Sequence, residues 1–184
     1  IAFETYEIDT TAFDGPITAP LLEVPQVTID DATAYEAWKA SNVIAQKQAG
    51  YFAIGIKVLL GDFYTDKARL LADLIKNYGA NELRFSLRQN IVIRNIKEEN
   101  LPFFYQELAK LDMVALGYKT IGDITACPGT DTCNLGIASS TGIADELEKV
   151  IKAEYPKYSN NQEIEIKISG CMNSCGQHMA ANIG

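Results

Sequence analysis

Hydrophobic residues alternate with smaller or polar residues along 51–58, which is the period of a β-strand. Apolar residues then recur every three or four positions between Thr65, which we expect to cap a helix, and Gly79, which we expect to end it. The stretch 82–96 reads as two short strands separated by a break at 89–90. These patterns predict a strand, a helix and two further strands in sequence.

A second helix is predicted to open at Asn100, because Pro102 is tolerated in a first helical turn, where its missing N–H has no intrahelical partner. The order from residue 51 is therefore βαββα, which indicates an α+β fold. The segment 1–40 reads as an N-terminal arm or linker, because its prolines interrupt regular structure. A short helix is predicted within 30–42.

The composition changes after Gly117, where a loop rich in Gly and Thr begins. A third helix follows, with an apolar stripe of Ile143, Leu147, Val150 and Ile151. The stretch 163–169 then alternates, which predicts a strand with Ile164, Ile166 and Ile168 inward. We therefore divide the chain into residues 1–40, 41–117 and 118–184.

Charge and hydropathy narrow the classes of function. The net charge of −8 argues against nucleic-acid binding, because neutralising phosphates needs a basic surface. No apolar run reaches the length of a membrane span, and the N-terminal residues do not resemble a signal peptide. Four cysteines are few for a secreted disulfide scaffold, so a cytoplasmic protein is expected.

The four cysteines form two pairs. Cys127 and Cys133 are separated by five residues, and Cys171 and Cys175 by three, with glycines beside each pair. Four thiolates suit an iron–sulfur cube or zinc, although zinc sites usually have tighter spacings. Four structural thiols, free or in disulfides, are the alternative that spacing leaves open.

A second candidate feature is a cluster of arginines. On a strand, Arg84 and Arg88 fall on the side opposite Phe85, and Arg94 can continue the polar side after the break. Up to three guanidinium groups would then share a sheet face, which suits a tetrapyrrole carrying carboxylates. A solvated sheet face explains the same pattern.

The motifs "CPGTDTC" and "CMNSC" together resemble the signature of sirohaem-dependent nitrite and sulfite reductases. The stretch "GANELRFSLRQNIVIRNI" is similar to a motif of the ferredoxin-like half-domain that precedes this signature in the family. The resemblance covers about residues 40–184. It implies a ferredoxin-like βαββα half-domain over 41–117, followed by a partial α/β cluster-binding domain over 118–184.

The resemblance also implies cofactors and a reaction. Cys127, Cys133, Cys171 and Cys175 would hold a [4Fe-4S] cluster, and Cys175 would also bridge to sirohaem. The reaction would be the six-electron reduction of nitrite to ammonia or of sulfite to sulfide, with electrons from a donor such as ferredoxin or a flavoprotein reductase. The residues implied to line the sirohaem are Arg84, Gln89, Asn90, Asn173 and Cys175.

Members of this family contain two such halves, whereas this sequence shows one of each domain type. We therefore expect a C-terminal-half fragment that lacks reductase activity without the missing N-terminal half. The basic residues that grip the anionic substrate come largely from that other half, so no catalytic residue is assigned. Two alternatives remain from other classes: a small [4Fe-4S] electron-transfer module without sirohaem, and a zinc-stapled structural domain.

Overall fold

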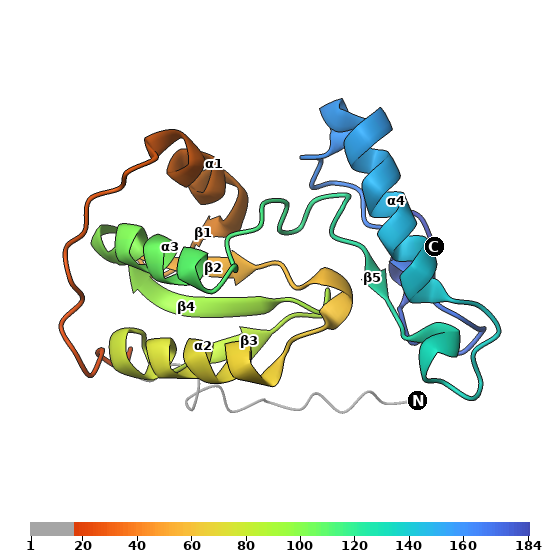
Figure 1. Cartoon of the computed structure of the whole chain (residues 1–184), viewed down its shortest axis with the longest axis horizontal. Coiled ribbons are helices and arrows are strands. Elements are labelled where there is room, and N and C mark those ends of the chain that lie inside the picture. The colour runs from red at the N-terminus through yellow and green to blue at the C-terminus, as the bar shows by residue number, and fades with distance from the viewer. Residues whose placement is uncertain (1–16) are drawn as a thin grey trace, which may run out of the picture.

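The computed structural model describes residues 17–184. Its larger unit is an antiparallel four-stranded sheet with strand order β1-β2-β4-β3 (Figure 1). The strands are β1 (Val43–Ala45), β2 (Tyr51–Ile56), β3 (Leu83–Phe85) and β4 (Ile91–Lys97). Strand β4 is central because it pairs with β2 on one side and β3 on the other.

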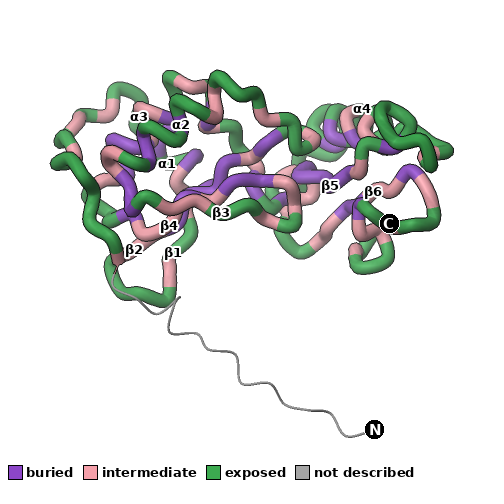
Figure 2. The backbone as a smooth tube through the Cα atoms, turned by 90° about the horizontal axis from the view of Figure 1, so that it is seen from below, coloured by how far each residue is buried: buried purple, intermediate pink, exposed green. Residues whose placement is uncertain are grey.

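Two helices, α2 (Thr65–Tyr78) and α3 (Leu101–Lys110), cover the same face of this sheet (Figures 1 and 2). Their apolar faces meet the inward side chains of β2 and β4 in one core. Because the side chains of a strand alternate, the face covered by the helices receives every second side chain, which explains the period of two in these strands. The most deeply buried members are Ile54, Ile56, Leu71, Ile91, Ile93, Leu101, Phe104 and Leu108.

Helix α1 (Ala32–Asn42) belongs to the same core, because its Trp38 is buried within it. The short helix predicted within 30–42 is present, and it begins at a capping residue, because the Asp31 carboxylate accepts a hydrogen bond from the Ala34 N–H. Part of the segment expected to be an arm is therefore packed structure. The first 16 residues of that segment lie outside the described residues.

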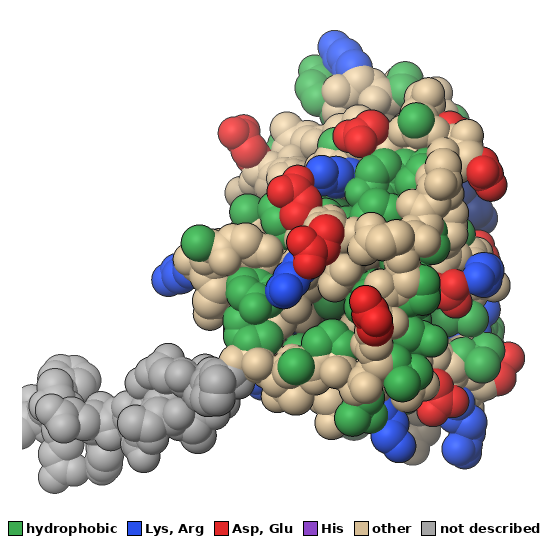
Figure 3. Space-filling model, turned by 90° about the vertical axis from the view of Figure 1, so that its left-hand side faces the viewer, with side chains coloured by type: hydrophobic (Ala, Val, Ile, Leu, Met, Phe, Trp, Pro, Cys, Tyr) green, Lys and Arg blue, Asp and Glu red, His purple; other side chains and the backbone are tan. Residues whose placement is uncertain are grey.

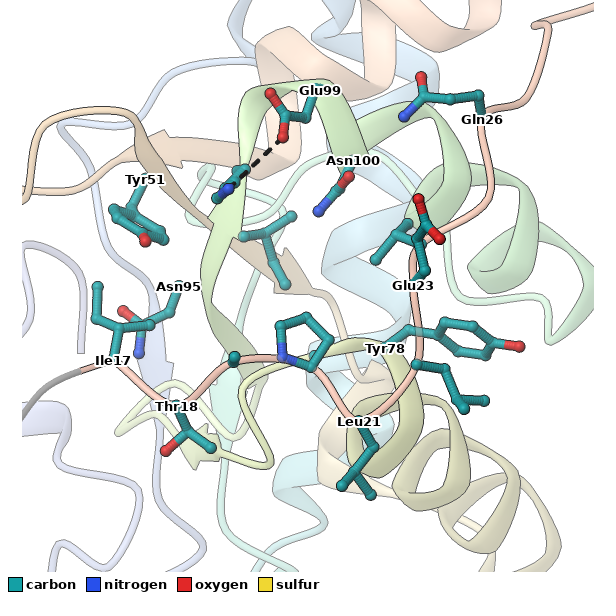
Figure 4. A pocket seen from close by; sticks show the side chains of 17 residues that line it. Ile17, Thr18, Leu21, Glu23, Gln26, Tyr51, Tyr78, Asn95, Glu99 and Asn100 are labelled. Atoms are coloured by element: carbon teal, nitrogen blue, oxygen red, sulfur yellow. Dashed lines mark ion pairs between the residues drawn. The ribbon is translucent and has the colours of Figure 1, made fainter.

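Residues 17–29 run along the outside of this unit (Figure 1). The Leu22 N–H donates a hydrogen bond to the Asn77 carbonyl near the end of α2. Between this arm and the sheet lies a pocket of about 500 Å³, into whose rim Tyr51, Tyr78 and Asn95 project (Figure 4). The arm is therefore docked at the end of the sheet remote from the cysteines.

The smaller unit contains a parallel pair of short strands and one long helix. Its members are β5 (Thr125–Ala126), β6 (Lys167–Ile168) and α4 (Ser140–Glu154). A small second core holds them together, formed by Ile124, Ala126, Ala144, Ile151 and Ile166. Short 3₁₀ turns complete the chain at Leu59–Gly61, Glu98–Asn100, Gly129–Asp131, Pro156–Tyr158 and His178–Ala180.

Tyr118 joins the two units by packing on the sheet face that the helices leave open. It lies against Gly55 of β2, where an added Cβ would lie 2.5 Å from the tyrosine ring. Asn42 fastens the same region, because its side-chain amide donates to the carbonyls of Gly55 and Ala115. The glycine in this strand is thus needed for the close approach of an aromatic ring.

The structure confirms the α+β class and the predicted order of elements, with three corrections. It adds β1, a strand too short to produce a period in the sequence. Thr65 is the first residue of α2 rather than its cap, and the cap residue Tyr64 makes no side-chain hydrogen bond. Only two residues of the stretch 163–169 are in β6. Of the residues before them, Ile166 bridges to Ile183 instead, and the Glu165 N–H donates to the Asn182 side chain.

The apolar stripe expected on α4 is largely exposed. Ile143 is 55% exposed, and Leu147 and Val150 are each 37% exposed. The helix instead buries Ser140, Ala144, Glu148 and Ile151, which are spaced at three and four residues. The prediction was right for Ile151 and wrong for the other three residues, because an apolar stripe does not indicate whether the described chain supplies a partner for it.

Charges of both signs are interspersed on the surface of the larger unit (Figure 3).

None of the helices within residues 17–184 is both long and apolar enough to cross a membrane.

Candidate functional site

The first cysteine loop leaves directly from β5. The Cys127 N–H donates to the Ile168 carbonyl on β6, at 3.1 Å, so the backbone of this cysteine is held by the sheet. The chain then turns through Gly129–Asp131, and the Cys133 N–H donates to the Gly129 carbonyl at 3.0 Å. Cys127 is half-buried, whereas Cys133 is exposed.

The second cysteine loop leaves from β6 and contacts the first. The Gly170 N–H donates a hydrogen bond to the Cys127 Sγ, at 3.1 Å. In return, the Ile137 N–H donates to the Gly170 carbonyl at 2.9 Å. Because Cys171 follows Gly170 directly, the parallel pairing of β5 and β6 brings the two cysteine pairs to the same end of one small sheet.

Glycines allow the two loops to approach this closely. A Cβ added to Gly170 would lie 2.7 Å from both the Gly129 Cα and the Ala138 carbonyl oxygen. Gly129 itself has a φ of +54°, which side chains rarely adopt. The glycines beside the cysteines are therefore required by packing between backbones, whatever the loops bind.

Ser140, at the start of α4, completes the surroundings of Cys127. Its hydroxyl donates to the Cys127 carbonyl at 2.6 Å and lies 3.3 Å from the Sγ. Burial works to raise the pKa of the Cys127 thiol, but hydrogen bonds at the sulfur, from Ser140 and then from the N–H groups of Gly170 and Gly129, lower the pKa overall. This environment stabilises the thiolate relative to that of an ordinary cysteine, and the thiolate is the form that binds metals.

The two residues of the second cysteine pair have the same burial classes as those of the first. Cys171 is half-buried, Cys175 is exposed, and all four cysteines are free thiols. Asn173, which lies between them in sequence, is exposed in a turn. Across residues 17–184, no three His, Cys, Asp or Glu side chains are grouped closely enough to hold a metal ion.

The identity of the four cysteines suits an iron–sulfur cube, whereas their arrangement in this structure does not yet form a site for one. Four thiols on glycine-rich loops are the ligands of an iron–sulfur cube. As arranged, the loops touch through Cys127 and Gly170 without bringing three thiols together. Ligation of one cube by all four would require the two loops to rearrange.

Gln89 and Asn90 lie in the turn between β3 and β4 and contact the smaller unit. The Gln89 side chain forms two hydrogen bonds with the backbone of Ala126, the residue before Cys127. Asn90 is fully buried; it accepts from the Val58 N–H at 2.8 Å and donates to the Asp123 carboxylate at 2.6 Å. Both side-chain amides are thus engaged within the protein.

The three arginines separate into two groups. Arg84 and Arg94 both pair with Glu82, at 2.6 and 3.2 Å. Arg88 instead pairs with Glu165 of the smaller unit. The alternation expected through Arg88 stops at Phe85, because β3 ends there and the chain turns.

Sequence reasoning missed several residues that support this site. Asp123 receives the Asn90 amide and the Lys119 N–H, and burial raises the pKa of its carboxyl group despite these bonds. Ser140 and Glu148 are buried on α4, although neither lies in the apolar stripe that was expected to be buried. The sequence did contain a signal for this buried side: Ser140 and Glu148 each lie four residues from the small Ala144 and so share one face of the helix with it.

Comparison with known proteins supports the resemblance to nitrite and sulfite reductases that the sequence motifs indicated. Residues 44–111 match the family described as the nitrite/sulfite reductase ferredoxin-like half domain. The chain is 25% identical to the chloroplastic ferredoxin–nitrite reductase of Spinacia oleracea over 97% of its length, covering 30% of that protein. It is 31% identical to the corresponding protein of Zea mays over 76% of its length, covering 24% of that protein.

The fold is also that of a solved structure, the NirA protein of Mycobacterium tuberculosis. The TM-score is 0.58 at 24% identity, over 89% of this chain and 28% of that one. The chain spans less than a third of the length of these proteins. It is thus a relative of the nitrite and sulfite reductases, and its residues 44–111 match their ferredoxin-like half domain.

Proposed function

We propose that this chain is the part of a nitrite or sulfite reductase that carries a [4Fe-4S] cluster beside sirohaem. The reaction would reduce nitrite to ammonia, or sulfite to sulfide, by six electrons. The observation that supports this most is the hydrogen bond from the Gly170 N–H to the Cys127 Sγ. It holds the two cysteine loops in contact in a chain whose relatives are named ferredoxin–nitrite reductases.

In this proposal Cys127, Cys133, Cys171 and Cys175 bind the cluster, which would supply one-electron transfers. Cys127 is prepared for this role, because its surroundings favour the thiolate and its backbone is fixed on β5. Cys175 would be shared with the sirohaem iron. Its exposure leaves the thiol open to a second group on the solvent side.

Arg84, Gln89, Asn90 and Asn173 are proposed to lie beside the sirohaem. Arg84 suits a carboxylate of the macrocycle, because its present partner Glu82 forms only a surface ion pair. Such pairs contribute roughly 0–1 kcal/mol, so a ligand carboxylate can replace Glu82 at little cost. Gln89 and Asn90 would contribute mainly by holding the cysteine strand, since their amides are already bonded to it and to Asp123.

We propose two kinds of partner for the complete system. Electrons would come from ferredoxin, as the names of the relatives suggest, or from a flavoprotein reductase. The remaining polypeptide of the relatives, including an N-terminal half, would supply the basic residues that bind the anionic substrate. This part of the proposal rests on the chain spanning less than a third of those proteins.

Anaerobic reconstitution with iron, sulfide and sirohaem tests the proposal. We expect about four iron atoms per chain and a broad absorption shoulder in the blue from the cube, with a red-region band when sirohaem is bound. Replacing Cys175→Ser should remove the coupling between the two cofactors, whereas Ser174→Ala, in the same loop, should retain it. Cluster binding without sirohaem would indicate an electron-transfer module, and stoichiometric zinc without iron would indicate a structural zinc domain.

A further inference from the structure

The side-chain amide of Gln89 binds one backbone unit twice. Its Nε2 donates to the Ala126 carbonyl at 2.8 Å, and its Oε1 accepts from the Ala126 N–H at 3.0 Å. A residue of a neighbouring antiparallel strand makes the same pair of bonds in a sheet. Gln89 thus presents to β5 the donor and acceptor that a strand would present.

Strand β5 has a free edge at this position. The N–H groups of Thr125 and Cys127 donate to the carbonyls of Ile166 and Ile168, on the β6 side. Because these groups alternate along a strand, those of Ala126 face the opposite edge. Within residues 17–184 no strand pairs with that edge, yet Ala126 is only 1% exposed. Its polar groups would be costly to bury without the bonds from Gln89.

Contacts other than those with Ala126 also hold Gln89 in place. Its backbone lies in a tight turn, where the Gln89 N–H donates to the Ser86 carbonyl at 3.1 Å. Gly61 packs on the side chain, and a Cβ at Gly61 would lie 3.2 Å from the Gln89 Cβ and Nε2. Asn90, the next residue, is tied to Val58 and Asp123. The amide is therefore preorganised toward β5.

We propose that Gln89 is a positioning residue that closes the free edge of β5 in place of a third strand. It would thereby set where Cys127, the residue that follows β5, lies relative to the half domain. The effect of Gln89 on β5 is expected in the protein without cofactors. Its consequence for the cluster rests on the proposed function, because Cys127 is the first proposed ligand.

The test begins with the cofactor-free chain and the variant Gln89→Ala. Gln46→Ala is a matched control within the half domain, because the Gln46 side chain also forms two hydrogen bonds with one residue: it accepts from the Asn95 N–H and donates to the Asn95 side-chain oxygen. We expect hydrogen exchange of the Ala126 amide to accelerate about three- to tenfold in Gln89→Ala, the factor for loss of one hydrogen bond. We also expect faster alkylation of Cys127, with the exposed Cys133 as an internal reference.

The control variant should change neither readout. If exchange at Ala126 and alkylation of Cys127 in Gln89→Ala match the wild type, the proposal is overturned. If Gln89→Ala does not fold, Gln89→Glu replaces it, since this isosteric side chain keeps the contact with Gly61 but cannot donate to the Ala126 carbonyl. Alkylation of Cys127 in Gln89→Glu above that in Gln46→Ala would support the proposal, and equal rates would overturn it.

Reconstitution then separates this inference from the proposed function. If the wild-type chain assembles a cluster, Gln89→Ala should assemble it more slowly and shift its electron paramagnetic resonance signature, while Gln46→Ala should not. An unchanged signature and rate would contradict positioning of the ligand. If the wild-type chain assembles no cluster, the proposed function fails, and exchange at Ala126 still decides whether Gln89 positions β5.

Discussion

The Lys57 ammonium and the Glu148 carboxylate form an ion pair of 2.5 Å that joins the end of β2 to the middle of α4. Their side chains are only 7% and 10% exposed. Lys57 also donates to the Gly122 carbonyl at 2.9 Å, and Lys152 pairs with Glu148 from the solvent side at 2.8 Å. The junction between the half domain and the cysteine unit is thus electrostatic as well as apolar.

Replacing Lys57→Met should destabilise the chain by about 2–4 kcal/mol, because it leaves a buried carboxylate with only its exposed lysine partner. Urea unfolding followed by circular dichroism measures the change. Lys39→Met removes an exposed ion pair with Glu98 and should change the free energy of unfolding by about 0.5 kcal/mol or less. An equal effect of the two substitutions would show that the Lys57 pair does not stabilise the junction.

The same carboxylate should make stability depend on pH. Burial works to raise the pKa of Glu148, but hydrogen bonds from Lys152 and Lys57 hold it below the ordinary value of 4.5. The stability contributed by this ionised group is therefore present above pH 4.5 and is lost as the pH falls through the pKa of the folded state. The difference in unfolding free energy between the wild type and Glu148→Gln should shrink in that range. A difference that stays constant with pH would contradict this assignment.

The close approach of the two cysteine loops should fail in Gly170→Ala. The added methyl group would meet two backbone atoms at 2.7 Å, so one loop has to shift. We expect a cost of about 1–3 kcal/mol in unfolding free energy, typical of overpacking, and faster alkylation of Cys127. Gly122→Ala is the matched control, since its nearest neighbours would be 4.0 Å from the new methyl group. Wild-type alkylation in Gly170→Ala would show that the loops tolerate separation.

The 184-residue chain alone should not reduce nitrite or sulfite with methyl viologen as the electron donor, even after reconstitution. It spans less than a third of its relatives, and the substrate-binding basic residues are proposed to lie in the remainder. An intact reductase of the family, assayed in parallel, provides the positive control. Turnover by the isolated chain above the rate of free cofactors would overturn this expectation.

The local elements were predictable because their patterns are local. Proline at the second position of α3 and the glycine after α2 marked helix ends correctly, and the alternation along 51–58 correctly identified the strand β2. Resemblance in two sequence motifs was sufficient to identify the family. The spacing of the cysteines indicated which residues are candidate ligands, but not where their sulfurs lie.

The chain by itself therefore determined the order of elements, the family and the candidate ligands. The tertiary structure decided which side of α4 is buried, which carboxylate pairs with Lys57, and that Gln89 bonds to Ala126 rather than facing solvent. The last two outcomes depend on contacts between residues that are 91 and 37 positions apart. Periodicity describes neighbours along one element, whereas burial and pairing depend on which other element packs against it.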